Sequence, residues 1–321
     1  MINKKDYSSN NIAVLIPCYD EQKTIVKVIQ DFRKELPGAK IYVFDNNSTD
    51  GSYKLAVNAG AIVIKEKRQG KGFVLSSMFK KVVADLYVLV DGDDTYPAEK
   101  VHDLIAPVLN EETDMVVGQR ISDYSQNAFR PLHYSGNKLV CALINLIFSA
   151  DLKDPMSGYR VFNRNVALEL PIVATGFDIE TEITLQMLFR HLMINEIEIP
   201  YGERPQGSFS KLNTFKDGVK VLLKIFSILR SYKPFVFFGG VGLILAGCGL
   251  IVGIFLIRKY ILYEGFINIP QAILATALVL FGIISATIGI ILHTMNYRLL
   301  ELSSNTSKMF HYIDYSLKEK K

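Results

Sequence analysis

Hydrophobic residues over the first 210 positions fall into two alternating patterns. Runs of three to five aliphatic and aromatic residues alternate with longer segments in which apolar residues recur every three or four positions. The first pattern is typical of buried strands and the second of amphipathic helices. Strands are expected at residues 12–16, 41–44, 62–64, 86–90 and 115–117, and helices at 21–36, 52–59, 72–83 and 97–109. This alternation predicts an α/β domain with a mostly parallel sheet.

Acidic and polar residues follow three of these strands. The segments are Pro-Cys-Tyr-Asp-Glu at 17–21, Asp-Asn-Asn-Ser-Thr-Asp-Gly at 45–51 and Asp-Gly-Asp-Asp at 91–94. Ligands of parallel sheets bind where the strands end, at the carboxyl edge. Any one of these segments would also serve as a helix N-cap, but three acidic loops at one edge are harder to explain as caps. Together they predict a ligand site.

Asp91 and Asp93 are two carboxylates on a turn that Gly92 relaxes. Both can face one hard divalent cation, and Mg²⁺ and Mn²⁺ prefer such oxygen ligands and often bridge to substrate phosphates. The Asp-x-Asp pattern occurs by chance in many proteins, so its position at the end of the fourth strand carries this prediction. Lys71, within Gly-Lys-Gly, lacks the spacing of a P-loop. It either offers a cation to a phosphate or belongs to a plain turn.

Two long segments near the C-terminal end contain no charged residue. Residues 235–257 form one, which spans about 35 Å as a helix, and residues 271–293 form the other. A bilayer core is about 30 Å thick. Two buried core helices are the alternative, but the length of both runs and their lack of a polar face favour transmembrane helices.

Cations flank these two segments unequally. Only Arg258 and Lys259 lie in the short loop between them, whereas many more precede the first and follow the second. The positive-inside rule therefore predicts that both ends are cytoplasmic. Residues 213–232 combine apolar residues at helical spacing with lysines, which favours an amphipathic helix on the inner membrane surface over an ordinary packed helix. The expected divisions are a cytoplasmic domain (1–212), a juxtamembrane segment (213–233), a two-helix anchor (234–298) and a cytoplasmic tail (299–321).

Composition narrows the class of protein. Hydrophobic residues make up 49% and charged residues 21% of the 321 positions, which excludes a polyelectrolyte-type disordered chain. A net charge of +4 is too weak and too dispersed for a dedicated nucleic-acid-binding protein. Cys18, Cys141 and Cys248 form no Cys-x-x-Cys pair, so neither a disulfide scaffold nor a zinc ribbon is expected, and a reducing compartment fits.

The loops at 17–21, 45–51, 68–72 and 91–94 together resemble those of a family 2 glycosyltransferase with a GT-A fold. Later segments narrow the resemblance, namely Gly-Gln-Arg at 118–120, Asp-Pro-Met-Ser-Gly-Tyr-Arg at 154–160 and Glu-Arg-Pro-Gln-Gly-Ser at 203–208. These are similar to motifs of the polyprenyl-phosphate glycosyltransferases, a group that includes dolichyl-phosphate mannose synthase and bacterial undecaprenyl-phosphate sugar transferases.

The resemblance implies a GT-A-type nucleotide-sugar-binding domain followed by two transmembrane helices. It also implies a membrane-bound, inverting enzyme that moves a sugar from a UDP-sugar to a polyprenyl (undecaprenyl) phosphate, with Mg²⁺ or Mn²⁺ as cofactor. Such an enzyme would lie in the inner (cytoplasmic) membrane and serve the modification of cell-envelope glycans.

The resemblance further implies a role for each matching residue. Those expected to bind the nucleotide sugar are Pro17, Tyr19, Glu21, Asp45, Lys71, Asp91, Asp93, Arg204 and Lys211, and the metal ligands among them are Asp91 and Asp93. Arg120, Arg130 and Ser135 would receive the lipid phosphate. Asp154 and Arg160 would lie beside the reacting sugar as catalytic residues.

The chemistry of the acceptor accounts for the arginines in this set. The second pKa of a phosphate monoester is about 6, so a lipid phosphate is already anionic near neutral pH and needs no strong general base. Positioning and charge compensation by arginine matter more. Arg120, Arg130 and Arg160 meet this need, although each of them would also suit a surface ion pair.

Two loops depart from the family pattern. The family often has Asp-Asp-Gly-Ser where residues 45–48 read Asp-Asn-Asn-Ser, and Asp-Ala-Asp-Leu-Gln where residues 91–95 read Asp-Gly-Asp-Asp-Thr. Thr95 therefore replaces the glutamine that would supply a third metal ligand.

Two other functions stay open. One is a glycosyltransferase that acts directly on a glycolipid or polysaccharide, although processive synthases usually have more spans and a Gln-x-x-Arg-Trp motif, and this chain has no Trp. The other is a catalytically inactive scaffold or sugar-nucleotide sensor, against which the retained Asp91, Asp93, Asp154 and Arg160 argue. No motif identifies the sugar, and the glycines of the first apolar segment fit a homo-oligomer.

Overall fold

The computed structural model describes residues 11–121, 131–170, 179–202, 226–262 and 269–318. The chain forms two compact units, Met1–Gly218 and Val219–Lys321.

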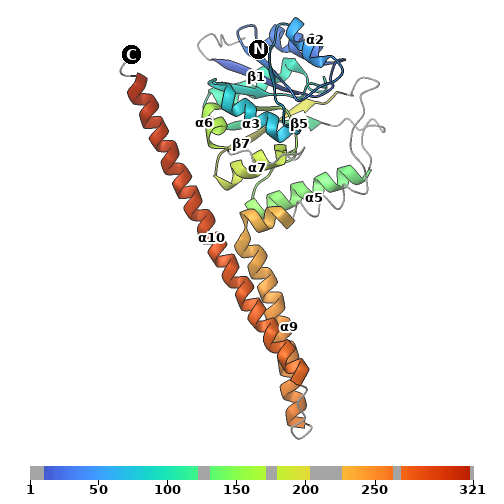
Figure 1. The fold of residues 1–321 in the computed structure, drawn as a ribbon, viewed down its shortest axis with the longest axis vertical. Helices are drawn as coiled ribbons and strands as arrows, with labels where there is room; N and C mark the ends of the chain where they lie inside the picture. Colours follow the sequence, from blue (N-terminus) through green and yellow to red (C-terminus); the bar gives the residue numbers. More distant parts are fainter. Residues whose placement is uncertain (1–10, 122–130, 171–178, 203–225, 263–268, 319–321) are drawn as a thin grey trace. The chain divides into compact units, whose positions relative to one another are not determined.

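The first unit is built around a seven-stranded sheet with the order β3-β2-β1-β4-β6-β5-β7 (Figure 1). Its strands are β1 (Ile12–Cys18), β2 (Lys40–Asp45), β3 (Ile62–Lys65), β4 (Leu86–Leu89), β5 (Met115–Ile121), β6 (Arg160–Asn163) and β7 (Ile194–Pro200). All neighbours run parallel except β6, which is antiparallel to both β4 and β5. The expected strands and the mostly parallel sheet are therefore confirmed, and β6 and β7 are added to them.

Helices connect most of these strands. They are α1 (Ile25–Glu35), α2 (Ser52–Asn58), α3 (Lys71–Lys81), α4 (Val101–Leu109), α5 (Pro131–Phe148), α6 (Arg164–Glu169) and α7 (Ile179–Phe189), with a short 3₁₀ helix, η1, at Ala98–Lys100. The four helices expected from periodicity correspond to α1–α4. Helix α1 begins later than expected because a turn precedes it, in which the backbone N–H groups of Thr24 and Ile25 both donate to the Glu21 carbonyl.

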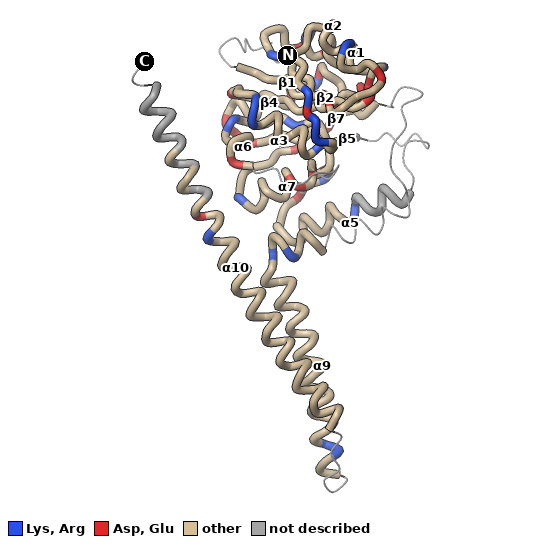
Figure 2. The backbone as a smooth tube through the Cα atoms, in the orientation of Figure 1, with Lys and Arg blue, Asp and Glu red and all other residues tan. Residues whose placement is uncertain are grey.

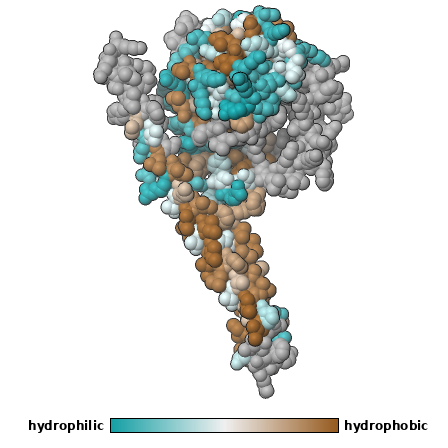
Figure 3. Space-filling model, in the orientation of Figure 1, coloured by the Kyte–Doolittle hydropathy of each residue, from teal (hydrophilic) through white to brown (hydrophobic). Residues whose placement is uncertain are grey.

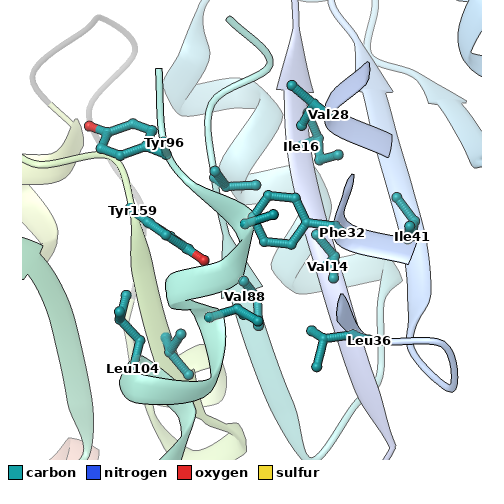
Figure 4. Packing of buried hydrophobic residues seen from close by; sticks show 14 of the residues in the cluster. Val14, Ile16, Val28, Phe32, Leu36, Ile41, Val88, Tyr96, Leu104 and Tyr159 are labelled. Atoms are coloured by element: carbon teal, nitrogen blue, oxygen red, sulfur yellow. The ribbon is translucent and has the colours of Figure 1, made fainter. Parts of the chain in front are cut away.

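The core lies on both faces of the sheet. Val14 and Ile16 of β1 pack with α1 and α4 on one face, while Ala13 and Leu15 pack with α3 and α7 on the other. Figure 4 shows the first of these layers, where Phe32 of α1 lies close to Tyr159. Their rings meet edge to face at 5.9 Å between centroids. Because both faces are covered, β1 is apolar at nearly every position, as parallel sheets require.

The second unit contains two long helices, α9 (Pro234–Leu262) and α10 (Ile269–Lys318), which lie side by side (Figure 1). Both are long and apolar enough to cross a membrane, over Pro234–Leu262 and Ile269–Leu302. Charged residues are sparse along them in Figure 2, and Figure 3 shows a hydrophobic surface over their packed region. Most of their large apolar side chains are exposed, including Leu243 at 78%. Core helices of water-soluble proteins bury such residues, so this exposure favours a lipid environment.

Small residues allow α9 and α10 to approach closely. A Cβ atom at Gly242 would lie 2.6 Å from the Gly282 carbonyl oxygen, and one at Gly282 would lie 2.7 Å from the Gly242 carbonyl oxygen. Ser285 adds a hydrogen bond by donating to the Phe238 carbonyl at 2.8 Å. Close backbone approach and hydrogen bonds of this kind stabilise helix pairs in membranes, where no hydrophobic difference drives association.

Gly242→Ala is expected to destabilise the helix pair by about 1–3 kcal/mol, because the added methyl group overlaps backbone atoms that cannot rotate away. Gly240→Ala is the matched control, since a Cβ there has no neighbour within 4 Å. The measurement is the thermal unfolding temperature of the full chain in detergent. Equal effects of the two substitutions would contradict the close contact.

Candidate active site

The carboxyl ends of β1, β2, β4 and β5 meet at one edge of the sheet, because these strands all run in the same direction. The loops after β1 and β2 hold each other there. The Asp20 N–H donates to Ser48 Oγ at 3.0 Å, the Thr49 N–H to Asp20 Oδ1 at 2.7 Å, and the Glu21 N–H to Ser52 Oγ at 2.8 Å. The first two acidic loops therefore form one continuous rim, as the sequence predicts.

Asp45, at the end of β2, is only 2% exposed. Its Oδ1 atom is buried and accepts no hydrogen bond from the residues that the structure describes. An unpaired buried carboxylate oxygen is costly, so this atom is suited to accept a hydrogen bond from a bound ligand. Burial, together with the charges of Asp45 and Glu21, raises the pKa of the neighbouring Cys18 to about 12 and keeps its thiol protonated.

Asn46 and Asn47 explain the departure from Asp-Asp-Gly-Ser in this loop. Asn46 Nδ2 donates to the carbonyls of Glu66 and Arg68 at 3.0 and 2.7 Å, while its Oδ1 accepts the Gly70 N–H at 2.8 Å. An ionised aspartate has no N–H and could not make the first two bonds. Asn47 has a φ of 65°, in the left-handed region that Gly adopts most easily and Asn tolerates. The amides thus bind the loop after β3 to the rim.

Glu66 restrains that loop from within. Its carboxylate accepts hydrogen bonds from the backbone N–H of Arg68 at 2.9 Å and from Arg68 Nε and Nη2 at 3.0 and 3.1 Å. Hydrogen bonds from the Arg68 side chain lower the pKa of Glu66 to about 2, despite the opposing effect of burial.

Lys71 begins α3 and connects three elements at the site. Its Nζ lies 2.6 Å from Asp91 Oδ1 and also pairs with Glu180 Oε1 at the start of α7. Burial alone would lower the pKa of Lys71, but the two carboxylates more than offset burial and raise it. Lys71 is therefore a largely buried, charged residue of the site and not part of a plain turn. Glu180 was not predicted, because nothing in its local sequence distinguishes it from a surface glutamate.

Asp93 is 3% exposed and is held by the residue two positions on. Thr95 donates to Asp93 Oδ1 from its hydroxyl at 2.6 Å and from its backbone N–H at 3.3 Å. The turn is fixed from the other side by Thr24, whose hydroxyl donates to the Gly92 carbonyl at 2.7 Å. Thr95 therefore orients Asp93 from the position where the family often has glutamine.

Arg120 and Asp154 form a bidentate ion pair. Arg120 Nε and Nη2 donate to the two carboxylate oxygens at 2.7 and 2.8 Å, and the Arg120 backbone N–H adds a third bond at 3.1 Å. Glu196 of β7 supports the pair by accepting the backbone N–H groups of Lys153 and Asp154 at 2.6 and 2.8 Å. Burial opposes the charge of Arg120, but the hydrogen bonds to Asp154 raise its pKa. No motif in the sequence points to Glu196.

Arg160 is fully buried beneath the loop that carries Asp154. Its guanidinium donates to the carbonyls of Pro155 and Ser157 at 2.7 and 2.9 Å and to Thr184 Oγ1 at 3.0 Å. Burial lowers the pKa of Arg160 to about 10, so it remains protonated near neutral pH. The sequence predicts Arg160 beside the reacting sugar, but its partners here are two loop carbonyls and the Thr184 hydroxyl. This arrangement makes it a support of the loop.

Gly158 brings the same loop against the Asp-x-Asp turn. A Cβ atom at this position would overlap Asp91 Oδ2, so no other residue fits without displacement. The Gly158 N–H donates to the Tyr96 hydroxyl at 2.9 Å. Through these contacts the Asp154 loop and the Asp91 turn form one packed site.

The remaining predicted residues are only partly described. Pro17 lies in β1, and Tyr19 follows it with 37% of its surface exposed. Ser135 belongs to α5, but its side chain lies outside the described part of the structure, as do residues 130, 204 and 211 with their predicted roles. A separate cavity of about 600 Å³ lies between the start of β4 and the ends of α4 and β6, and none of the predicted site residues lines it.

Comparisons with known proteins identify the family and the fold of the chain. Residues 13–170 match the family described as Glycosyl transferase family 2. The chain is 31% identical to glycosyltransferase AglJ of Haloferax volcanii over 281 residues, which cover 87% of this chain and 92% of that protein. It is 27% identical to the dolichyl-phosphate hexose transferase of the same organism over 217 residues, covering 67% and 92% of the two chains.

Among solved structures, glucosyl-3-phosphoglycerate synthase from Mycobacterium tuberculosis, in complex with Mn²⁺ and uridine-diphosphate-glucose, has a similar fold. The TM-score is 0.56 at 21% identity, and the match covers 70% of this chain and 79% of that one. The GT-A-type α/β fold expected from the sequence is thereby confirmed.

Glu66→Gln tests the charge that restrains the loop after β3. Because the folded pKa of Glu66 is depressed, its contribution should be complete above about pH 4.5 and be lost as the pH falls toward 2. At pH 7 the variant should be less stable by about 1–2 kcal/mol. This loss is modest because Arg68 is largely exposed and solvent screens its attraction to Glu66. Thermal unfolding between pH 7 and pH 3 measures this difference, which should shrink on acidification.

The exposed Glu112 provides the control, since Glu112→Gln should change stability by less than about 0.5 kcal/mol at any pH. A pH-independent loss in Glu66→Gln would mean that packing, not charge, accounts for the effect.

Proposed function

Because the chain belongs to glycosyl transferase family 2, we propose that it transfers a sugar from a UDP-sugar to a polyprenyl phosphate at a membrane surface, with inversion. The observation that carries this proposal is a fixed cation, Arg120, on the same sheet edge as Asp45, Asp91 and Asp93. The family accounts for the glycosyl transfer. The charges of the site and the two apolar helices support the choice of substrates.

The donor half of the site is suited to a nucleotide. The unpaired buried oxygen of Asp45 is placed to accept a hydrogen bond from a ribose hydroxyl or a base N–H. Tyr19 and Glu21, on the adjoining rim, would line the same pocket. The Mn²⁺ and uridine-diphosphate-glucose complex of the mycobacterial synthase supports a UDP-sugar donor for this fold.

Asp91 and Asp93 fit a divalent cation that enters with the donor. Within the described residues no three His, Cys, Asp or Glu side chains form a metal cluster. Mg²⁺ and Mn²⁺ commonly bind through one or two carboxylates plus substrate phosphates and water, so a pair of aspartates suffices. When bound, the ion would neutralise charge on the departing nucleoside diphosphate.

The acceptor half is suited to a phosphate that is already ionised. Asp154 accepts two of the five side-chain N–H donors of Arg120, and among the residues that the structure describes no hydrogen-bond partner is seen for the others, which suits them to a phosphate. Since such an acceptor needs no strong base, the role of Asp154 is to orient Arg120. Arg130 and Ser135 would complete the acceptor site, and Arg204 and Lys211 would close over the diphosphate.

The two apolar helices give a reason for membrane attachment. A polyprenyl phosphate keeps its lipid tail in the bilayer and its phosphate at the headgroup level, so an anchored enzyme can act on it without extracting it. The distribution of Lys and Arg supports a catalytic domain and both ends on the cytoplasmic side of an inner membrane. Cytoplasmic access to a cysteine engineered between α9 and α10 would contradict this orientation.

The direct test is a screen of UDP- and GDP-sugars with the full chain and undecaprenyl phosphate in vesicles, read by the mass of the lipid. We expect one UDP-sugar to add a single sugar to the lipid phosphate and to yield a mild-acid-labile product. Transfer to a glycolipid or polysaccharide without this product would favour a direct polymer transferase, and no transfer from any donor would favour an inactive scaffold.

Arg120→Ala should raise the KM for the lipid phosphate by roughly 30-fold or more, the effect of losing a desolvated charged contact. The KM for the UDP-sugar should change less than about twofold, because the donor half does not use this side chain. Asp154→Asn should act in the same direction, since an amide N–H would face the guanidinium.

Lys153→Ala is the matched control for both variants. Lys153 is largely exposed and gives Glu196 only its backbone N–H, which alanine keeps. Steady-state kinetics with each substrate varied in turn measures all three variants. Equal changes in both KM values for Arg120→Ala would exclude it from the acceptor site.

A further inference from the structure

The ammonium group of Lys71 pairs with Asp91, a residue that is expected to bind the metal. Lys71 Nζ contacts Asp91 Oδ1 at 2.6 Å and pairs with Glu180 Oε1. Its side chain is only 15% exposed, and that of Glu180 8%. The three groups come from the start of α3, the turn after β4 and the start of α7, so the contact depends on the whole fold.

Both oxygens of Asp91 have close neighbours, although its side chain is 27% exposed. Oδ1 faces the Lys71 ammonium, and Oδ2 lies so close to Gly158 that a Cβ there would overlap it. A divalent cation and an ammonium repel each other, and in a buried site this repulsion is poorly screened. A metal that takes Oδ1 of Asp91 must therefore displace Lys71 from that oxygen.

Glu180 is held in place independently of Lys71. Thr184 Oγ1 lies 3.0 Å from both the Glu180 carbonyl and the Pro155 carbonyl, and it accepts a hydrogen bond from Arg160 at 3.0 Å. The first turn of α7 is thus tied to the loop that supports the site. When Lys71 leaves Asp91, Glu180 remains as its partner, so no buried ammonium is left unpaired.

We propose that Lys71 is a tethered cation that occupies Asp91 until the donor arrives, and that Glu180 is the positioning residue that retains Lys71 afterwards. This inference rests on the proposed use of a nucleotide diphosphate and a divalent cation. The diphosphate offers Lys71 a new anionic partner, so the metal displaces it more easily in the presence of nucleotide. Metal and nucleotide therefore bind with positive coupling, and the metal alone binds weakly.

The test is a titration of Mn²⁺ into the full chain in detergent, with free Mn²⁺ followed by electron paramagnetic resonance, in the absence and presence of UDP. For the wild type, UDP should tighten Mn²⁺ binding at least tenfold. Lys71→Met should bind Mn²⁺ alone at least tenfold more tightly than the wild type, and UDP should then add less. The exposed Lys81 of the same helix provides the matched control, Lys81→Met, which should bind Mn²⁺ like the wild type.

Glu180→Gln should weaken the binding of Mn²⁺ alone about threefold or more, because Lys71 then has Asp91 as its one carboxylate partner. If Glu180 acts through Lys71, this effect should disappear in the Lys71→Met background. An electrostatic effect of Glu180 on the metal would instead be equal in both backgrounds and would overturn the positioning role. Glu182→Gln, on the same helix, is the control for a general change of charge.

Lys71→Met leaves two carboxylates without their cation and could misfold for that reason. The double variant Lys71→Met/Glu180→Gln removes one charge of each sign and therefore controls for misfolding. It too should bind Mn²⁺ alone more tightly than the wild type. Unchanged Mn²⁺ affinity in both Lys71 variants, or no Mn²⁺ binding even with UDP, would overturn the proposal. The assay contains no acceptor, so a failure of the lipid-phosphate transfer assay is distinguishable from a failure here.

Discussion

The pairing of charges at the carboxyl edge of the sheet is the constraint on which the site depends. Acidic side chains gather there because β1, β2 and β4 end together, and like charges in a partly buried region repel one another. Lys71 and Arg120 compensate them from within the fold, and each is held by carboxylates from other elements. Breaking such a pair on one side leaves a buried charge without a partner, which is far more costly than removing both.

The two cations differ in how firmly they are held. Arg120 makes two parallel bonds to Asp154, and Glu196 fixes the backbone on which Asp154 sits, so its direction is set. Lys71 presents a single ammonium on a flexible chain, and an ammonium can exchange one oxygen partner for another with little change in geometry. The site thus combines a rigid cation, suited to orienting a substrate, with one that can follow a change of charge at Asp91.

Much of the first unit was predictable because its signals are local. The strands and helices up to β5 follow from hydrophobic periodicity. The meeting of the acidic loops at one edge follows from the parallel direction of the strands that precede them. Glu180 and Glu196 were not predictable, since each is defined by a contact with residues more than 40 positions away. Arg160 illustrates the same limit. Its place in a motif indicated a role at the site, but only the packing of the loop over its side chain reveals that its partners are carbonyl oxygens.

The departures from the family pattern have one feature in common, which is that each new side chain makes hydrogen bonds within the protein. Asn46 donates to two carbonyls of the loop after β3, which an aspartate could not do, while its Oδ1 still accepts a backbone N–H. Thr95 fixes Asp93 with its hydroxyl at the position of a longer amide. The result is a more self-supporting rim, in which Asp45 alone among the rim carboxylates keeps a buried oxygen unpaired within the described residues. Leaving this oxygen buried without a hydrogen bond is costly, and a bound ligand that donates a hydrogen bond to it would offset that cost.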